Sequence, residues 1–204
     1  NAIYWAAFEL SKSPNKATLM VGNLSEILKY ALDSPDKEVS LRQEIQYTKH
    51  YLQIQSMRHE NRFAVQWQYT PDVLDIPTIR LIIQPLVENC IYHATEKTDR
   101  KVAIKIALRI RHGRLRIAVI DNGQGMSAQM LRRLREIPLR NEPEEPGAHI
   151  GLYNTVKRLQ LKYNCANPFS IRSRPGRGTF VRLDIPLAEP KAEARATVEQ
   201  ACKT

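Results

Sequence analysis

Three polar side chains that could do chemistry lie within a largely apolar segment, 84–94, whose sequence is QPLVENCIYHA. Glu88, Asn89 and His93 share it with hydrophobic residues that recur at helical spacing over 79–91, which predicts a largely buried helix. Asn89 and His93 are four residues apart, so both side chains project from one face of that helix. They could bind a metal ion or another ligand. Alternatively, all three groups are internally hydrogen-bonded, because unpaired buried polar groups are strongly unfavourable.

Glycine-containing motifs follow downstream: Asp121-x-Gly123-x-Gly125, then Gly147 to Gly151, then Gly176-x-Gly178-Thr179. Taken singly, each could be an ordinary turn or the entry to a helix. Their order carries more information. A polar helix with Asn is followed by a strand pair, DxGxG, a loop, a glycine-led helix, and GxGT between two strands.

Hydrophobic periodicity predicts the elements that must position these motifs. Helical spacing over 1–62 predicts a short first helix and then a helical hairpin, whose last helix opens with a capping box at Ser40. Pro77 is expected to start the helix that carries Asn89. Alternating residues predict strands at 63–69, 102–110, 115–119, 169–174 and 179–185, and further helices follow Ser127 and cover 150–163.

The composition is that of a soluble globular protein, with 43% hydrophobic and 25% charged residues. The net charge of +10 raises the question of nucleic acid. The basic residues are spread along the sequence without interleaved aromatics, so a solvated face, a polyanionic ligand or an acidic partner is the more economical explanation. Cys90, Cys165 and Cys202 lack metal-ligand spacing, and Cys90 is expected in the core.

The motifs together resemble the ATP-binding domain shared by sensor histidine kinases, gyrase-type ATPases and related chaperones. QPLVENCIYHA is similar to the N box, and DNGQGM, GAHIGLYNTVKRLQLKYN and PGRGTFVRLDIP are similar to the glycine boxes and the closing strands. The segment VSLRQEIQYTKHYLQIQSMRHENRF narrows the resemblance to LytS/YehU-type sensor histidine kinases.

The resemblance implies an α+β fold: a helical hairpin followed by a two-layer α/β sandwich of the Bergerat ATP-binding type, with a mixed, mostly antiparallel sheet. It assigns 1–62 to a dimerisation hairpin of the phosphoacceptor type and 63–187 to the ATP-binding catalytic domain. Residues 188–204 are expected to be a flexible tail.

The same resemblance implies the site. Asp121 would accept a hydrogen bond from the adenine amine, while Asn89 would bind Mg²⁺ between the phosphates. Glu88 would either polarise the nucleophile or serve as a structural partner. With Glu88 and Asn89 as catalytic residues, the predicted ATP-binding set is Asn89, His93, Asp121, Gly123, Gly125, Met126, His149, Ile150, Gly151, Leu152 and Thr179.

Two positions depart from the family pattern. His149 stands where many relatives have glycine, so either the lid hinge is stiffer or His149 itself faces phosphate. Pro85 stands where hydrolysing relatives carry the glutamate that activates water, so ATP hydrolysis is not expected as the main reaction.

The expected function is therefore that of a sensor histidine kinase fragment that uses ATP and Mg²⁺ and begins just after the acceptor histidine. His50 and His59 are interpreted as surface residues outside the acceptor position. The expected partners are a second copy and a response regulator, and the full-length protein would be anchored at the cytoplasmic face of the bacterial inner membrane. The alternatives are an ATPase or ATP-gated clamp of the same superfamily, and a basic nucleic-acid-binding module.

Overall fold

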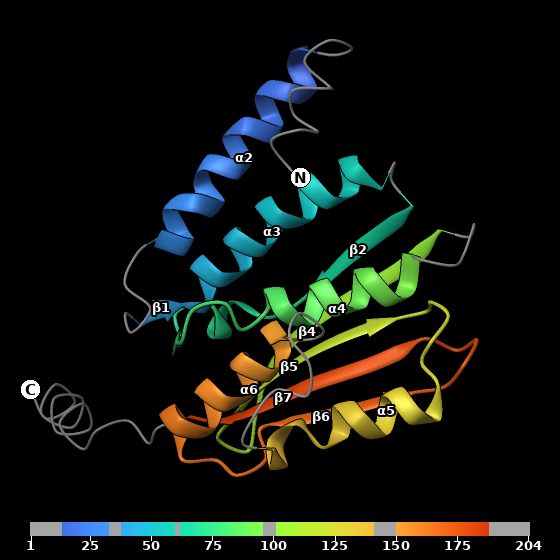
Figure 1. Ribbon diagram of the computed structural model, residues 1–204. Helices are drawn as coiled ribbons and strands as arrows, with labels where there is room; N and C mark the ends of the chain where they lie inside the picture. The colour runs from blue at the N-terminus through green and yellow to red at the C-terminus, as the bar shows by residue number, and fades with distance from the viewer. Residues whose placement is uncertain (1–13, 33–37, 60–61, 96–100, 141–149, 188–204) are drawn as a thin grey trace, which may run out of the picture.

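The computed structural model describes residues 14–32, 38–59, 62–95, 101–140 and 150–187; the side chains of residues 14, 31 and 93–95 are not described. A five-stranded sheet carries helices on one face, and a long N-terminal helix lies outside this pair of layers (Figure 1). The predicted short first helix and the tail 188–204 lie outside the described residues. No described helix is both long enough and apolar enough to cross a membrane.

The sheet has the order β2-β4-β5-β7-β6. Its strands are β2 (Phe63–Gln68), β4 (Val102–Arg111), β5 (Arg114–Asp121), β6 (Phe169–Ser173) and β7 (Thr179–Pro186). β2 pairs with β4 in parallel and every other pairing is antiparallel, which confirms the expected mixed, mostly antiparallel sheet. Buried and more exposed residues alternate along β5 and β7, as expected for strands covered on one face.

Three helices cover the buried face of the sheet: α4 (Gln84–Thr95), α5 (Ala128–Arg135) and α6 (Ile150–Tyr163) (Figure 1). Short 3₁₀ turns lie at η1 (Pro71–Val73) and η2 (Ile137–Leu139). The main core contains Leu86 of α4, Ile117 of β5 and Leu159 of α6, all fully buried. The predicted α/β sandwich is thereby confirmed.

The helical hairpin consists of α2 (Pro14–Leu32) and α3 (Leu41–Arg58). Ser40 caps α3 with the predicted capping box, because its hydroxyl accepts from the Gln43 backbone and the Gln43 side chain accepts from the Ser40 backbone. Leu41, Ile45 and Leu52 of α3 belong to the same buried cluster as the sheet. The hairpin and the sheet therefore share one core.

The prediction that Pro77 starts the site helix is wrong. Pro77 and Thr78 form β3 (Pro77–Thr78), which pairs antiparallel with β1 (Val39–Ser40), and α4 begins at Gln84. Leu81 adopts a left-handed φ of 58°, which is incompatible with a continuous helix through this segment. The backbone N–H groups there donate to the Glu44 side chain instead. Apolar periodicity alone could not reveal this, because the segment is buried in either conformation.

Candidate nucleotide site

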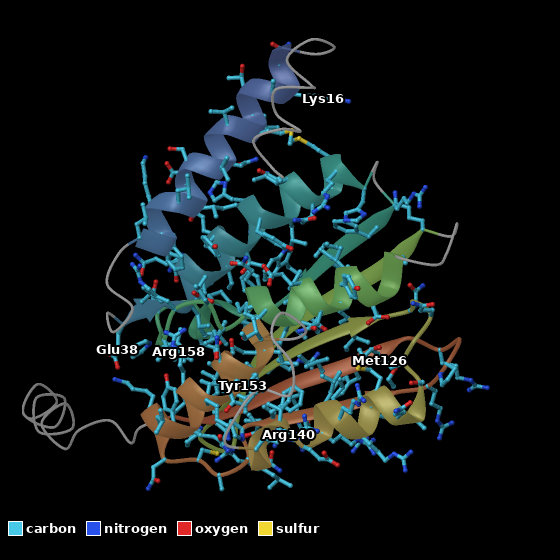
Figure 2. All side chains as sticks on the ribbon, in the orientation of Figure 1. Lys16, Glu38, Met126, Arg140, Tyr153 and Arg158 are labelled. Carbon is cyan, nitrogen blue, oxygen red and sulfur yellow. The ribbon has the colours of Figure 1, made fainter. Side chains whose placement is uncertain are left out.

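A pocket lies between the helices α4, α5 and α6 and the strands β5, β6 and β7. Its lining residues are Leu86, Asn89, Cys90, Val119, Asp121, Met126, Leu134, Leu152, Ile171, Thr179 and Val181. Five of them belong to the predicted ATP-binding set: Asn89, Asp121, Met126, Leu152 and Thr179. In Figure 2, Met126 lies between α4 and α5. The fold thus brings together residues that are up to ninety positions apart in the sequence.

Asp121 is the last residue of β5 and its carboxylate is almost fully buried. Oδ1 accepts from the backbone nitrogens of Gly123 at 2.8 Å and Thr179 at 3.2 Å, while the Cys90 thiol lies 3.5 Å from Oδ2. Burial raises the pKa of Asp121, and these three donors oppose the rise. Burial and the nearby carboxylate raise the pKa of the Cys90 thiol, so it stays protonated and can donate.

Asp121 is the acidic hydrogen-bond acceptor of the pocket. A carboxylate has about four acceptor positions and three donors are present here, so Asp121 retains capacity for an exocyclic amine. The walls around it are aliphatic, with Val119, Leu152 and Ile171 among them. The adenine role of Asp121 stays a prediction.

The two glycine motifs beside Asp121 touch each other through their backbones. A methyl group added at Gly178, where φ is +82°, would lie 2.0 Å from the carbonyl oxygen of Asp121. One added at Gly125, where φ is +68°, would lie 2.0 Å from the carbonyl oxygen of Arg174. Gly125 belongs to the predicted ATP-binding set. In the structure, its smallness is already required by the neighbouring β6–β7 turn.

Ser173 ties the same motifs together and was missed in the sequence. Its hydroxyl accepts from the Met126 nitrogen at 2.9 Å, donates to the Gly178 carbonyl at 2.9 Å, and lies 3.0 Å from the Thr179 hydroxyl. Ser173 pairs with Thr179 in the β6–β7 register. Two hydroxyl residues at matching ends of a predicted hairpin are a signal that could have identified it.

The side chains of Asn89 and Glu88 point away from α4 in different directions. The Asn89 amide nitrogen donates to the Pro85 carbonyl at 2.8 Å, and the residue lines the pocket. Glu88 accepts from Gln84 at 2.5 Å, and it lies on the α3 side, where burial and the Glu88 charge raise the pKa of Tyr47 to about 12. Burial also raises the pKa of Glu88. Both alternatives for Glu88 stay predictions: it contacts Gln84 on α4, and one of its oxygens also lies close to Gly151 of α6.

The helix predicted to follow the second glycine box is present as α6, which starts at Ile150. Gly151 packs on α4, since a methyl group there would contact Pro85 at 3.6 Å and lie 3.9 Å from a Glu88 oxygen. Leu152 enters the pocket, whereas Ile150 is 43% exposed. His149 and the side chain of His93 lie outside the described part of the chain.

His50 is not a simple surface residue, contrary to the expectation. Its Nδ1 lies 2.8 Å from Oδ1 of the buried Asn23, so this partly buried pair bridges α2 and α3. His59 packs edge-on against Phe63, with the ring centroids 6.3 Å apart. Helical periodicity did not mark His50 as inward because its polar partner lies on another helix.

Comparison with protein families places this geometry in context. The family described as histidine kinase-, DNA gyrase B-, and HSP90-like ATPase matches residues 74–189, more than half of the chain. The chain belongs to this family. A second family, described as histidine kinase, matches residues 1–63. The ATPase-family match confirms the resemblance found in the four motifs, and the histidine-kinase match covers the hairpin that precedes them.

Individual relatives of this ATPase-family chain are sensor kinases. It is 30% identical over 187 residues to a sensor-like histidine kinase of Staphylococcus epidermidis, covering 92% of the chain and 36% of the relative. It is 27% identical over 188 residues to the sensor protein kinase HptS of Staphylococcus aureus, with the same coverage. The chain thus spans about a third of the length of these curated relatives.

Solved structures support the fold of the ATPase-family chain. The histidine kinase domain of a blue-light activated kinase from Erythrobacter litoralis has a TM-score of 0.52 at 15% identity, covering 91% of this chain and 85% of that one. The catalytic domain of histidine kinase ThkA has a TM-score of 0.54 at 15% identity, covering 74% and 94%. At such identity the likeness concerns the fold alone.

Proposed function

We propose that the chain is the catalytic part of a sensor histidine kinase. It binds Mg-ATP and transfers the γ-phosphate to a histidine of the dimerisation hairpin, and the phosphoryl group then passes to an aspartate of a response regulator. The observation that carries the proposal is the buried Asp121 carboxylate in an apolar pocket that Asn89 also lines. The names of the relatives as sensor kinases support the same reaction class.

Each residue has a distinct task in this proposal. Asp121 accepts from the adenine amine and thereby disfavours guanine, whose carbonyl would leave the carboxylate unpaired. Asn89 has its amide nitrogen on the Pro85 carbonyl, so its oxygen is the atom suited to a hard cation. Mg²⁺ would neutralise charge on the phosphates during transfer. The N-terminus of α6 at Gly151 offers backbone N–H groups to phosphate oxygens.

Transfer to a protein acceptor is favoured over hydrolysis as the main reaction. Pro85 occupies the position from which a glutamate would activate water, and its ring lies against α6 near Gly151. No ionisable group can be supplied from this position. The chain's own residues therefore contribute positioning and charge stabilisation, which is most of what phosphoryl transfer requires.

The hairpin supplies the proposed dimer contact. The functional division at 62/63 remains a proposal. The two-fold dimer is also a proposal, and it is supported by apolar side chains that α2 leaves exposed, Val21, Leu28 and Leu32. Membrane anchoring of the whole protein is proposed by analogy with sensor kinases.

Calorimetry with Mg-ATP tests the nucleotide site directly. We expect binding by the wild-type chain, a large loss of affinity in Asp121→Asn, and loss of the Mg²⁺ dependence in Asn89→Ala. Fusion of an acceptor helix with its histidine is expected to give ATP-dependent, acid-labile phosphorylation. Steady phosphate release without phosphoprotein would instead favour the ATPase alternative. Unchanged affinity in Asp121→Asn would refute the adenine assignment.

A further inference from the structure

The face of the five-stranded sheet opposite α4, α5 and α6 is strongly basic. Strand pairing aligns the outward residues into rows across β4, β5, β7 and β6. The cations on this face, called here the outer-face cations, are Lys105, Arg109, Arg111, Arg114, Arg116, Arg172 and Arg182. Asp184 is the acidic residue among the outward positions of these strands. Seven positive charges and one negative charge give +6, more than half of the net +10 of the chain.

The concentration of charge is invisible in the sequence. Lysine and arginine residues that are spread from 105 to 182 converge only when the antiparallel register stacks them. The expectation that the basic residues are spread therefore holds along the chain and fails in space. A localised field of one sign attracts a polyanion far more strongly than the same charge distributed over a whole surface.

The arrangement of these charges destabilises the sheet. Arg109 pairs with Arg116 and Arg111 pairs with Arg114 on neighbouring strands, and like charges directly opposite each other are destabilising. Asp184 compensates in part, since its carboxylate binds Arg114 and also Nε of Arg116 at 3.1 Å. Among the described strand residues of this face, one carboxylate against seven cations leaves a large excess of positive charge. Folding gains nothing from this excess, which points to a partner.

The rest of the face limits what that partner can be. The other outward side chains are mainly alanine, glutamine and serine. Ile120 of β5 and Phe180 of β7, which pair with each other, are half-buried. A specific protein interface usually has an apolar centre, and single-stranded nucleic acid requires stacking aromatics. A surface of anionic phospholipids requires neither, because its headgroups rearrange laterally to match fixed cations. Guanidinium groups also suit phosphate, which they can bind in bidentate fashion.

We propose that the outer-face cations dock this domain onto an anionic phospholipid bilayer. The helices α4, α5 and α6 lie on the opposite face of the sheet, together with the pocket (Figure 1). Docking by the outer face leaves the helix layer and its pocket directed away from the lipid. This contact adds to any anchor elsewhere in the protein and is independent of the proposed kinase activity.

Vesicle co-sedimentation of the full chain tests the proposal. The wild type is expected to bind vesicles of mixed phosphatidylcholine and phosphatidylglycerol, to ignore vesicles of phosphatidylcholine alone, and to dissociate in high salt. Arg109→Glu with Arg172→Glu reverses two exposed outer-face cations and is expected to weaken binding by at least about tenfold.

The matched control is Arg58→Glu with Arg132→Glu, which reverses two exposed cations on helices. It changes the net charge equally and is expected to retain vesicle binding. Equal loss in both double variants would overturn the proposal, since net charge would then suffice. So would the absence of binding at low salt, or tighter binding to duplex DNA or polyglutamate than to vesicles at equal anionic charge. Calorimetry with Mg-ATP on the same variants separates this outcome from failure of the nucleotide site.

Discussion

The Glu44 carboxylate of α3 lies 2.9 Å from the backbone nitrogen of Ile82, in the segment that leads into α4. It also accepts from the nitrogens of Leu81 at 2.6 Å and Ile83 at 3.2 Å, and from the Tyr30 hydroxyl of α2. Glu44 is fully buried. One side chain therefore joins both hairpin helices to the helix that carries Asn89, and it satisfies backbone donors that no helix or strand could satisfy.

Removal of this carboxylate should destabilise the whole chain. Glu44→Ala is expected to lower the free energy of unfolding by about 3 kcal/mol, because several buried donors lose their acceptor. Tyr30→Phe is the control: it removes one donor and keeps the backbone contacts, so its effect should be about 1 kcal/mol. Urea denaturation followed by circular dichroism measures both. An equal loss in the two variants would contradict the assigned role of the backbone contacts.

The elements with strong periodicity were predictable from sequence, and so was the order of the motifs. The alternation in β4 and β5 and the capping box at Ser40 are local signals. The predicted bounds of these strands and of α3 are therefore close to the observed ones. The features that the sequence did not predict depend on contacts between distant segments. The left-handed Leu81 is held by Glu44, thirty-seven positions away, and no local pattern encodes that contact.

The residues of the site also fall into those that the sequence could predict and those that it could not. Asp121, Gly123 and Thr179 could be selected because they belong to recognisable motifs, and the structure joins them by hydrogen bonds. Ser173 was missed because its role comes from its position beside two turns rather than from a motif. The basic sheet face was missed for a related reason, since only strand register brings its arginines together.

Burial of Asp121 predicts opposite pH dependences for the free energy of unfolding and for nucleotide affinity. The pKa of Asp121 is raised from its ordinary value of 3.8, so the native state holds the proton more tightly than the unfolded chain does. Between these two pKa values this group makes the free energy of unfolding fall as pH rises. Above the window the charged form imposes a constant destabilisation. Adenine binding requires the charged form, so affinity should fall as pH is lowered through the same window.

Urea unfolding and nucleotide titration across mildly acidic pH measure the two effects. Asp121→Asn is expected to flatten the contribution of this residue to the unfolding curve while it also weakens binding. Subtraction of the variant from the wild type removes the titration of the other carboxylates. A stability difference that grows in favour of the wild type as pH rises through this window would have the wrong sign and would refute the raised pKa.

Alanine substitutions at the two glycines of the β6–β7 turn distinguish the cost of backbone strain from the cost of steric contact. Gly178→Ala combines a φ of +82° with a methyl group 2.0 Å from the Asp121 carbonyl, so it should lower the free energy of unfolding by about 3 kcal/mol or more. Gly176→Ala has a similar φ of +73° but meets nothing within 4 Å, so about 1 kcal/mol is expected. Thermal or urea unfolding of both variants measures the difference. Similar losses would mean that the turn can shift away from Asp121.

The exposed stripe on α2 predicts how the chain self-associates. Val21, Leu28 and Leu32 share one helix face, and their exposed fractions are 52%, 49% and 83%. In a two-fold dimer each substitution acts twice, so Leu28→Asp should raise the dimer dissociation constant by about two orders of magnitude. Light scattering after size-exclusion chromatography, over a dilution series, measures this constant.

Leu161→Asp provides the control because Leu161 of α6 is an exposed leucine, at 83%, that lies on the sheet domain. It should leave the dissociation constant unchanged. Equal weakening by the two variants would assign the dimer contact to general surface hydrophobicity. A wild-type chain that stays monomeric throughout the dilution series would remove α2 as a sufficient dimer surface, because its apolar stripe would then be stable in contact with water.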